Sequence, residues 1–71
     1  MSYLEAREYA TIEQRITEAD QVLQERRAQL EDPAIASDGP RLLRAHAEME
    51  EAQKVTDELY SRWAELEQKK G

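Results

Sequence analysis

The chain has 71 residues, of which 37% are charged and 39% are hydrophobic, and its formal net charge is −6 at pH 7. It contains two Gly, two Pro, one His, and no Cys or Phe. A chain this short forms at most one small domain and is too small to enclose a catalytic pocket. Without Cys there is no disulfide or thiolate metal site, and a single His excludes a multi-histidine site. We therefore expect no enzyme, no catalytic residue and no metal site in these residues.

Membrane insertion and secretion are not indicated by the sequence. No apolar stretch approaches the roughly 20 residues that a membrane-spanning helix needs, and the N-terminus has no cationic, apolar signal segment. We expect a cytoplasmic protein with no membrane partner. The acidic surface repels phosphate and anionic lipid, so any contact with nucleic acid depends on a local concentration of positive charge.

The first predicted helix extends from about Tyr3 to Glu31. Ser2 followed three residues later by Glu5 is a capping-box pattern, which marks a helix start. Pro33 ends the helix, because proline lacks a backbone donor and restricts the residue before it. Within the helix, residues alternate at intervals of three and four, the spacing of a coiled-coil seam. These seam residues are Tyr9, Ile12, Ile16, Ala19, Leu23, Arg26 and Leu30.

A bend follows at about residues 32–39, where most of the turn-forming residues gather. Asp32 before Pro33 also fits the N-cap of one short helical turn inside the bend. Gly39-Pro40 fits the beginning of a second helix, because proline is tolerated in the first turn.

The second predicted helix covers about residues 40–69 and repeats the same spacing. Its seam residues are Leu42, Ala45, Met49, Ala52, Thr56, Leu59, Trp63 and Leu66. The residues that flank the seam are mostly charged or Gln. Three pairs at i,i+4 are expected in the favourable orientation on the helix surface: Glu50 with Lys54, Glu58 with Arg62, and Glu65 with Lys69.

A connection of about seven to nine residues is short enough to turn the second helix back along the first. One register then brings both seams together along their length. It pairs Leu30 with Leu42, Arg26 with Ala45, Leu23 with Met49, Ala19 with Ala52, Ile16 with Thr56, Ile12 with Leu59 and Tyr9 with Trp63. Because both halves of the chain support this register, we predict an all-α fold, a two-helix antiparallel coiled-coil hairpin that forms a single domain over residues 1–71.

Positive charge is concentrated at the bend. Residues 1–25 contain six acidic and two basic residues, residues 26–44 three acidic and four basic, and residues 45–71 seven acidic and four basic. The basic residues of the middle segment are Arg26, Arg27, Arg41 and Arg44. Arg26 occupies a seam position, and Arg41 and Arg44 begin a helix, where acidic residues are more stabilising. Arginines that weaken the fold in this way indicate a binding site for the phosphates of a nucleic acid.

Two other interpretations remain open. In the first, the arginines serve only the fold, because they pair with acidic neighbours or extend past the seam. The acidic neighbours are Glu31, Asp32 and Asp38. In the second, apolar residues beside the seam join two hairpins into a four-helix homodimer, which makes the chain a protein-interaction module that does not bind nucleic acid. These residues are Val22, Leu43, Val55 and Tyr60.

Three segments carry a family resemblance. The chain opens with Ser2-Tyr3-Leu4-Glu5-Ala6-Arg7-Glu8-Tyr9 and Ile12-Glu13, and the bend begins with Leu30-Glu31-Asp32-Pro33. It closes with Leu59-Tyr60-Ser61-Arg62-Trp63-Ala64-Glu65-Leu66-Glu67, an aliphatic-Tyr-x-Arg-Trp-x-x-Leu-Glu pattern. Together these segments resemble the C-terminal domain of ABC-F ATP-binding-cassette proteins of the Uup type, from Tyr3 to about Glu67.

The resemblance implies a coiled-coil hairpin that follows two ATPase cassettes in a longer cytosolic protein, often labelled an ABC transporter ATP-binding protein although it lacks membrane domains. ATP and Mg belong to those cassettes. Their motifs are absent from these 71 residues, so this fragment needs no cofactor of its own. The family is associated with ribosomes and translation, and the Uup branch with DNA binding through this arm. The implied partners are therefore the adjacent cassettes and DNA or ribosomal RNA, with nucleic-acid contact confined to the arginines at the bend.

Overall fold

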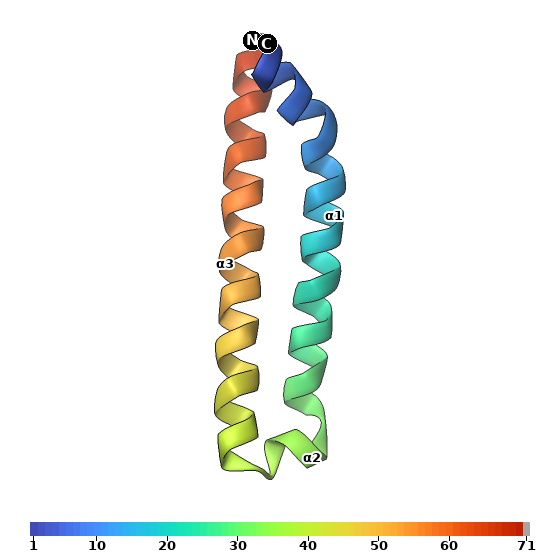
Figure 1. Cartoon of the computed structure of the whole chain (residues 1–71), viewed down its shortest axis with the longest axis vertical. Coiled ribbons are helices and arrows are strands. Elements are labelled where there is room, and N and C mark those ends of the chain that lie inside the picture. Colours follow the sequence, from blue (N-terminus) through green and yellow to red (C-terminus); the bar gives the residue numbers. More distant parts are fainter. Residues whose placement is uncertain (71) are drawn as a thin grey trace.

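The computed structural model describes residues 1–70 as two long antiparallel helices joined by a short one (Figure 1). The elements are α1 (Tyr3–Glu31), α2 (Pro33–Ala36) and α3 (Gly39–Lys70). The molecule measures 50 × 16 × 14 Å, with both termini at one end and α2 at the other. The predicted all-α hairpin is confirmed, and the bounds of both long helices agree with the predicted ones to within one residue.

Local hydrogen bonds fix where the helices begin and end. The Ser2 Oγ accepts a hydrogen bond from the Glu5 backbone N–H at 3.2 Å, and the Ser2 N–H donates to the Glu5 carboxylate at 3.0 Å, as the capping-box pattern predicts. At the bend, Asp32 before Pro33 has the extended backbone that ends α1. Its carboxylate accepts from the Ala34 N–H at 2.9 Å and so begins α2, which is the short turn expected inside the bend.

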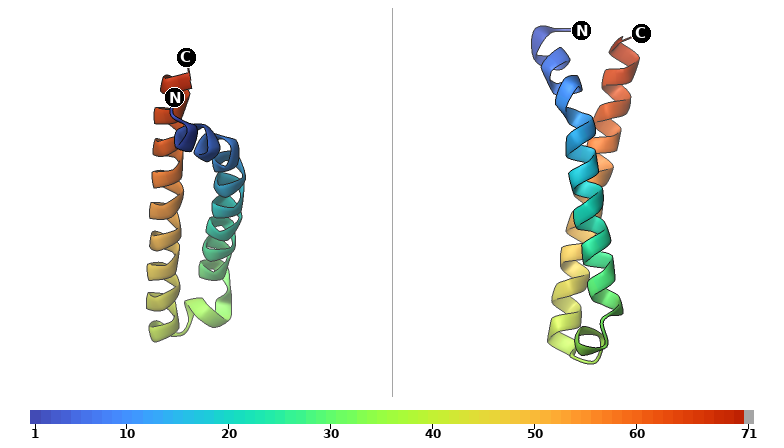
Figure 2. Two further views of the ribbon diagram at one scale, coloured as in Figure 1. Left: turned by 45° about the horizontal axis from the view of Figure 1, so that its top comes forward. Right: turned by 90° about the vertical axis from the view of Figure 1, so that its right-hand side faces the viewer.

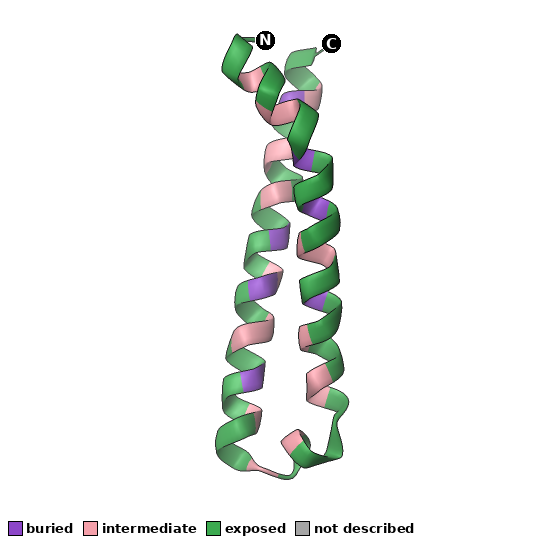
Figure 3. Ribbon diagram, turned by 45° about the vertical axis from the view of Figure 1, so that its right-hand side comes forward, coloured by how far each residue is buried: buried purple, intermediate pink, exposed green. Residues whose placement is uncertain are grey.

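The predicted seam residues face the opposite helix (Figure 3). The buried ones are Ile12, Ile16 and Leu23 in α1 and Ala45, Ala52, Thr56 and Leu66 in α3. All the other predicted seam residues are half-buried. The alternating spacing therefore identified the contact stripe of each helix correctly, whereas the exact pairing of residues within each layer stays a prediction.

The most tightly packed part of the seam lies towards the end that carries the termini. Ile12 and Leu66 are 1% and 0% exposed, and together with Ile16 they form the core cluster. Tyr9, Leu59 and Trp63 pack against this cluster. The predicted pairs left Leu66 without a partner, yet it is the most deeply buried of these residues.

Small residues occupy the middle of the seam. Ala52 is buried and Ala19 half-buried, and the buried Thr56 hydroxyl donates a hydrogen bond to the Ala52 carbonyl at 2.9 Å. These short side chains fill little of the space beside the seam. The neighbouring Val22 and Val55 consequently remain 42% and 41% exposed.

The first turns of α1 curve towards the end of α3 (Figures 1 and 2). This curvature brings Glu5 to Lys69 and Glu8 to Arg62, two pairs that join the helices across the end where both termini lie. The hairpin is therefore fastened at this end by polar contacts as well as by the core cluster.

Replacement of the most buried leucine should destabilise the hairpin strongly. We expect Leu66→Ala to lower the free energy of unfolding by about 2–5 kcal/mol, because it leaves a cavity beside Ile12 and Ile16. Urea unfolding followed by circular dichroism measures this change. Leu43→Ala is the matched control, since Leu43 is 75% exposed, and it should change stability by no more than about 0.5 kcal/mol. Equal losses in the two variants would contradict this description of the core.

Candidate nucleic-acid interface at the bend

Asp38 positions the first arginine of α3. Its carboxylate accepts a hydrogen bond from the Arg41 N–H at 3.2 Å, and its carbonyl accepts from the Leu42 N–H at 2.8 Å, so Asp38 acts as the N-cap of α3. The second Asp38 carboxylate oxygen lies 3.9 Å from the Arg41 Nε. The Arg41 side chain nevertheless remains 66% exposed, so most of its guanidinium donors are accessible to a partner.

Arg44 lies in the next turn of α3 and is exposed. Among residues 1–70, the Arg44 side chain has no ion-pair or hydrogen-bond partner. Arg41 and Arg44 both line a shallow depression of about 190 Å³, together with Gln29, Ile35 and Glu48. The structure thus brings two of the four predicted site residues together in one place.

Arg26 reaches out from its half-buried seam position. Its guanidinium lies 3.3 Å from the Glu48 carboxylate, and both side chains are partly exposed. Glu48 also lines the depression that holds Arg41 and Arg44. Arg26 is therefore next to the predicted site, but its charge is engaged by a carboxylate of the same chain.

Arg27 lies apart from the other three arginines. Its Nη2 donates a hydrogen bond to the Gln53 side chain at 2.6 Å, and Gln53 in turn donates to Asp57 at 2.9 Å. Arg27 and Gln53 each follow a seam residue in the sequence, whereas Glu48 precedes one. Positions just before and just after a seam residue lie on opposite flanks of a coiled coil. The four arginines therefore do not converge as expected, because Arg27 faces the other flank.

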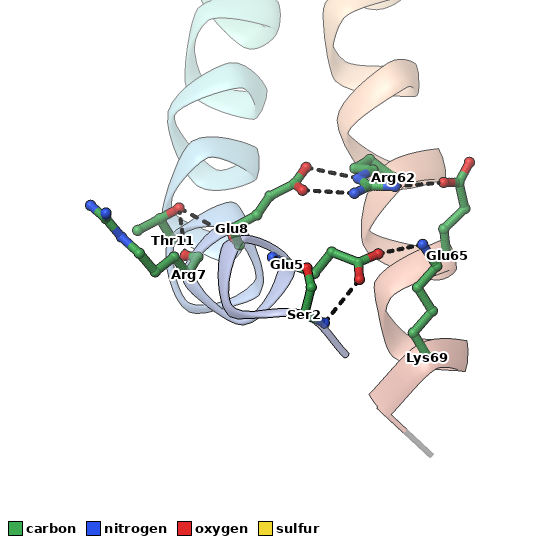
Figure 4. Close-up of polar contacts among 8 residues, drawn as sticks. All are labelled: Ser2, Glu5, Arg7, Glu8, Thr11, Arg62, Glu65 and Lys69. Carbon is green, nitrogen blue, oxygen red and sulfur yellow. Dashed lines mark hydrogen bonds and ion pairs between the residues drawn. The ribbon is translucent and has the colours of Figure 1, made fainter.

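A second polar cluster, which the sequence did not reveal, joins the helices near the termini (Figure 4). Arg62 donates two hydrogen bonds to the Glu8 carboxylate, from Nε and Nη2, both at 2.8 Å, and a third from Nη1 to Glu65 at 2.9 Å. Lys69 pairs with Glu5. We call these five residues the open-end clamp. The two-point contact between Arg62 and Glu8 fixes the orientation of both side chains, which a single contact would not.

The open-end clamp differs from the surface pairs predicted within α3. The sequence predicts that Arg62 and Lys69 each pair with the glutamate four residues earlier, but both side chains form ion pairs with glutamates of α1. Glu8 and Arg62 immediately precede the seam residues Tyr9 and Trp63. Such flanking positions commonly form interhelical ion pairs in coiled coils, and this placement was the signal available in the sequence.

The contacts of this end shift several pKa values. Hydrogen bonds from Lys69 and from Ser2 lower the pKa of Glu5 from 4.5 to about 2. Arg62 likewise lowers the pKa of Glu8 by hydrogen bonding to its carboxylate. The Tyr9 hydroxyl donates a hydrogen bond to the Glu67 carboxylate, and this hydrogen bond raises the pKa of Tyr9. The carboxylates of Glu5 and Glu8 therefore stay ionised well below neutral pH.

Membrane-spanning helices and metal-binding groups are both absent from the described part of the chain. Within residues 1–70, no helix has the length and apolar character required to cross a membrane. In the same residues, no three His, Asp or Glu side chains are placed to hold a metal ion.

Comparison with known families places nearly the whole chain in a described family. The sequence profile of the family described as the ABC transporter C-terminal domain matches residues 1–68, nearly the whole chain. No characterised protein and no solved structure gave a significant match. The matched segment includes the bend, both seams and all but the last residues of α3.

The open-end clamp should make the stability of the hairpin depend on acid pH. Glu5 and Glu8 have lowered pKa values in the folded chain, so their contribution is complete above the ordinary value of 4.5 and is lost as the pH falls towards about 2. We expect the Tm, measured by circular dichroism, to fall across this interval. The double variant Glu5→Gln/Glu8→Gln, in which Gln still permits the capping box, should show a flatter dependence.

The control for this experiment is Glu31→Gln/Glu58→Gln, which removes two exposed carboxylates outside the open-end clamp. It should keep the acid dependence of the unsubstituted chain. If the Tm of both double variants falls with pH as steeply as that of the unsubstituted chain, the open-end clamp is not the source of the acid dependence.

Proposed function

Because the chain belongs to the ABC transporter C-terminal domain family, we propose that it is the C-terminal arm of a cytoplasmic ABC-F ATP-binding protein of the Uup type. We propose further that its bend contacts nucleic acid, either DNA or ribosomal RNA. The observation that carries this proposal is the pair of exposed arginines, Arg41 and Arg44, that line one depression at the tip of the hairpin.

The distribution of charge favours an end-on contact. Of the three segments 1–25, 26–44 and 45–71, residues 26–44 alone contain more basic than acidic residues, and they form the bend and the adjoining turns. The rest of the 50 Å hairpin is acidic and repels a phosphate backbone. A nucleic acid is therefore attracted to the tip and kept away from the sides of the two helices.

The chemistry of the tip suits phosphate. Guanidinium groups bind phosphate through two parallel hydrogen bonds, and Arg44 has no partner within residues 1–70 that must first be displaced. The contact of Arg41 with Asp38 is long and exposed, so it competes only weakly with a phosphate. Arg26 contributes indirectly, because it neutralises Glu48, the carboxylate of the depression that would otherwise repel the ligand. Arg27 has at most a secondary role from the opposite flank.

Nucleotide chemistry is assigned to other parts of the longer protein. In this proposal the ATPase cassettes bind ATP and Mg²⁺, and the arm carries a contact surface without a catalytic residue. A cationic tip at the far end of a stiff hairpin, with both termini at the near end, suits a part that reaches from the cassettes to a large partner.

Reversal of the two tip charges should abolish binding. We expect Arg41→Glu/Arg44→Glu to eliminate the change in fluorescence anisotropy that the unsubstituted chain produces with a labelled DNA duplex or ribosomal RNA hairpin at 50 mM salt. Glutamate at position 41, in the first turn of α3, favours the helix, and Arg44 has no ion-pair partner within residues 1–70 to lose, so we expect this variant to remain folded. Two phosphate contacts also predict that the binding constant of the unsubstituted chain falls with salt with a logarithmic slope of about −2.

The matched control is Arg7→Glu/Arg15→Glu, which changes the net charge by the same amount in the N-terminal half of α1, away from the tip. This variant should retain most of the binding. Equal loss in the two double variants would show that total charge, and not the tip, governs the interaction, and unchanged binding by the tip variant would reject the site.

A further inference from the structure

An open apolar groove runs along one flank of the hairpin, halfway between the tip and the open-end clamp. Its floor is formed by Ala19 and Val22 of α1 and by Ala52 and Val55 of α3. It measures about 340 Å³, which is within the range of about 300–1,000 Å³ typical of binding pockets. The groove is separate from the depression at the tip that is proposed to contact nucleic acid, although Glu48 lines both.

The groove follows from the small residues of the seam. Ala19 and Ala52 do not reach far enough to cover the valines beside them, so Val22 and Val55 expose about two fifths of their surface. A single exposed valine is common on protein surfaces, but these two come from different helices and line the same hollow. Four aliphatic side chains thus form a continuous strip into which the side chains of another helix can insert.

The rim of the groove is acidic. Glu18, Glu48 and Glu51 line it, and the one basic residue among its lining side chains is Arg26, which lies against Glu48. Two carboxylates, those of Glu18 and Glu51, are therefore not neutralised by a basic residue of the groove. An occupant that places a Lys or Arg on either side of its apolar face complements this arrangement.

We propose that this groove binds a basic amphipathic helix of a partner protein, which packs across α1 and α3 as a third helix. An apolar face with residues at i, i+3 or i+4, and i+7 matches an elongated strip between two helices. The basic side chains beside that face would pair with Glu18 and Glu51. This interaction uses a flank of the hairpin and does not depend on the contact proposed for the tip.

A second copy of the chain is a poorer occupant. A symmetric dimer through this groove would place the same surface on both sides of the contact. Glu18 and Glu51 of one copy would then approach the corresponding carboxylates of the other, and like charges in close contact weaken association. The acidic rim thus favours a basic partner over the homodimer of hairpins.

The test uses two synthetic helical peptides that share a leucine and alanine face and differ only in the flanking residues, which are lysine in one and glutamate in the other. Each is titrated into the 71-residue chain while the valine methyl signals are followed by NMR. We expect the lysine peptide to shift the signals of Val22 and Val55 and to bind at least about tenfold more tightly than the glutamate peptide.

Two variants of the chain make the test specific. Val55→Asp should weaken binding of the lysine peptide about tenfold or more, whereas Leu43→Asp, the same change at a more exposed residue outside the groove, should leave the affinity for this peptide unchanged. Glu18→Lys/Glu51→Lys changes no seam residue and should reverse the preference, so that the glutamate peptide binds more tightly. A melting curve for each variant shows that it is folded.

Three results would overturn the proposal: equal affinity for both peptides, an unchanged preference in the charge-reversed variant, or no shift of the Val22 and Val55 signals. Sedimentation of the chain without peptide tests whether a second copy of the chain occupies the groove instead. A dimer that Val55→Asp dissociates would show that a second copy occupies the groove, and the proposed partner would then be wrong.

Discussion

The packing of Ile12 and Ile16 against Leu66 is the interaction on which the hairpin depends. Two helices of 29 and 32 residues with mostly charged flanks gain little stability separately, because helical stability in proteins comes mainly from burial of an apolar stripe. The core cluster provides that burial at the end carrying both termini, and the open-end clamp adds polar contacts there. The tip lies at the opposite end of the hairpin and contains no residue of the core cluster.

The size and polarity of the seam side chains change along the length of the hairpin. Large side chains near the termini fill the space between the helices, whereas Ala19 and Ala52 leave the flanks open in the middle. Towards the bend the seam includes Arg26, which cannot be fully buried without a partner. The cluster of large buried side chains therefore lies near the termini, whereas the rest of the seam buries mostly small residues and leaves apolar and charged groups exposed beside it.

Local signals made the helices and their seams predictable. The Ser2 capping box, the break at Pro33 and the alternating spacing are each encoded within a few residues, so no knowledge of the partner helix was needed. The open-end clamp and the separation of Arg27 from Arg41 were missed for the opposite reason. They depend on how the two helices are rotated about their axes, and this rotation decides whether a flanking side chain faces its own helix or the other one.

Glu48 connects the two surfaces for which functions are proposed. It lines both the depression at the tip and the groove beside Val22 and Val55, and Arg26 is its ion-pair partner. A leucine at position 26 would pack better in the seam but would leave the Glu48 carboxylate uncompensated at both places. The arginine therefore has a physical reason to occupy a seam position: it compensates the Glu48 carboxylate, which would otherwise add an unpaired negative charge beside Arg41 and Arg44.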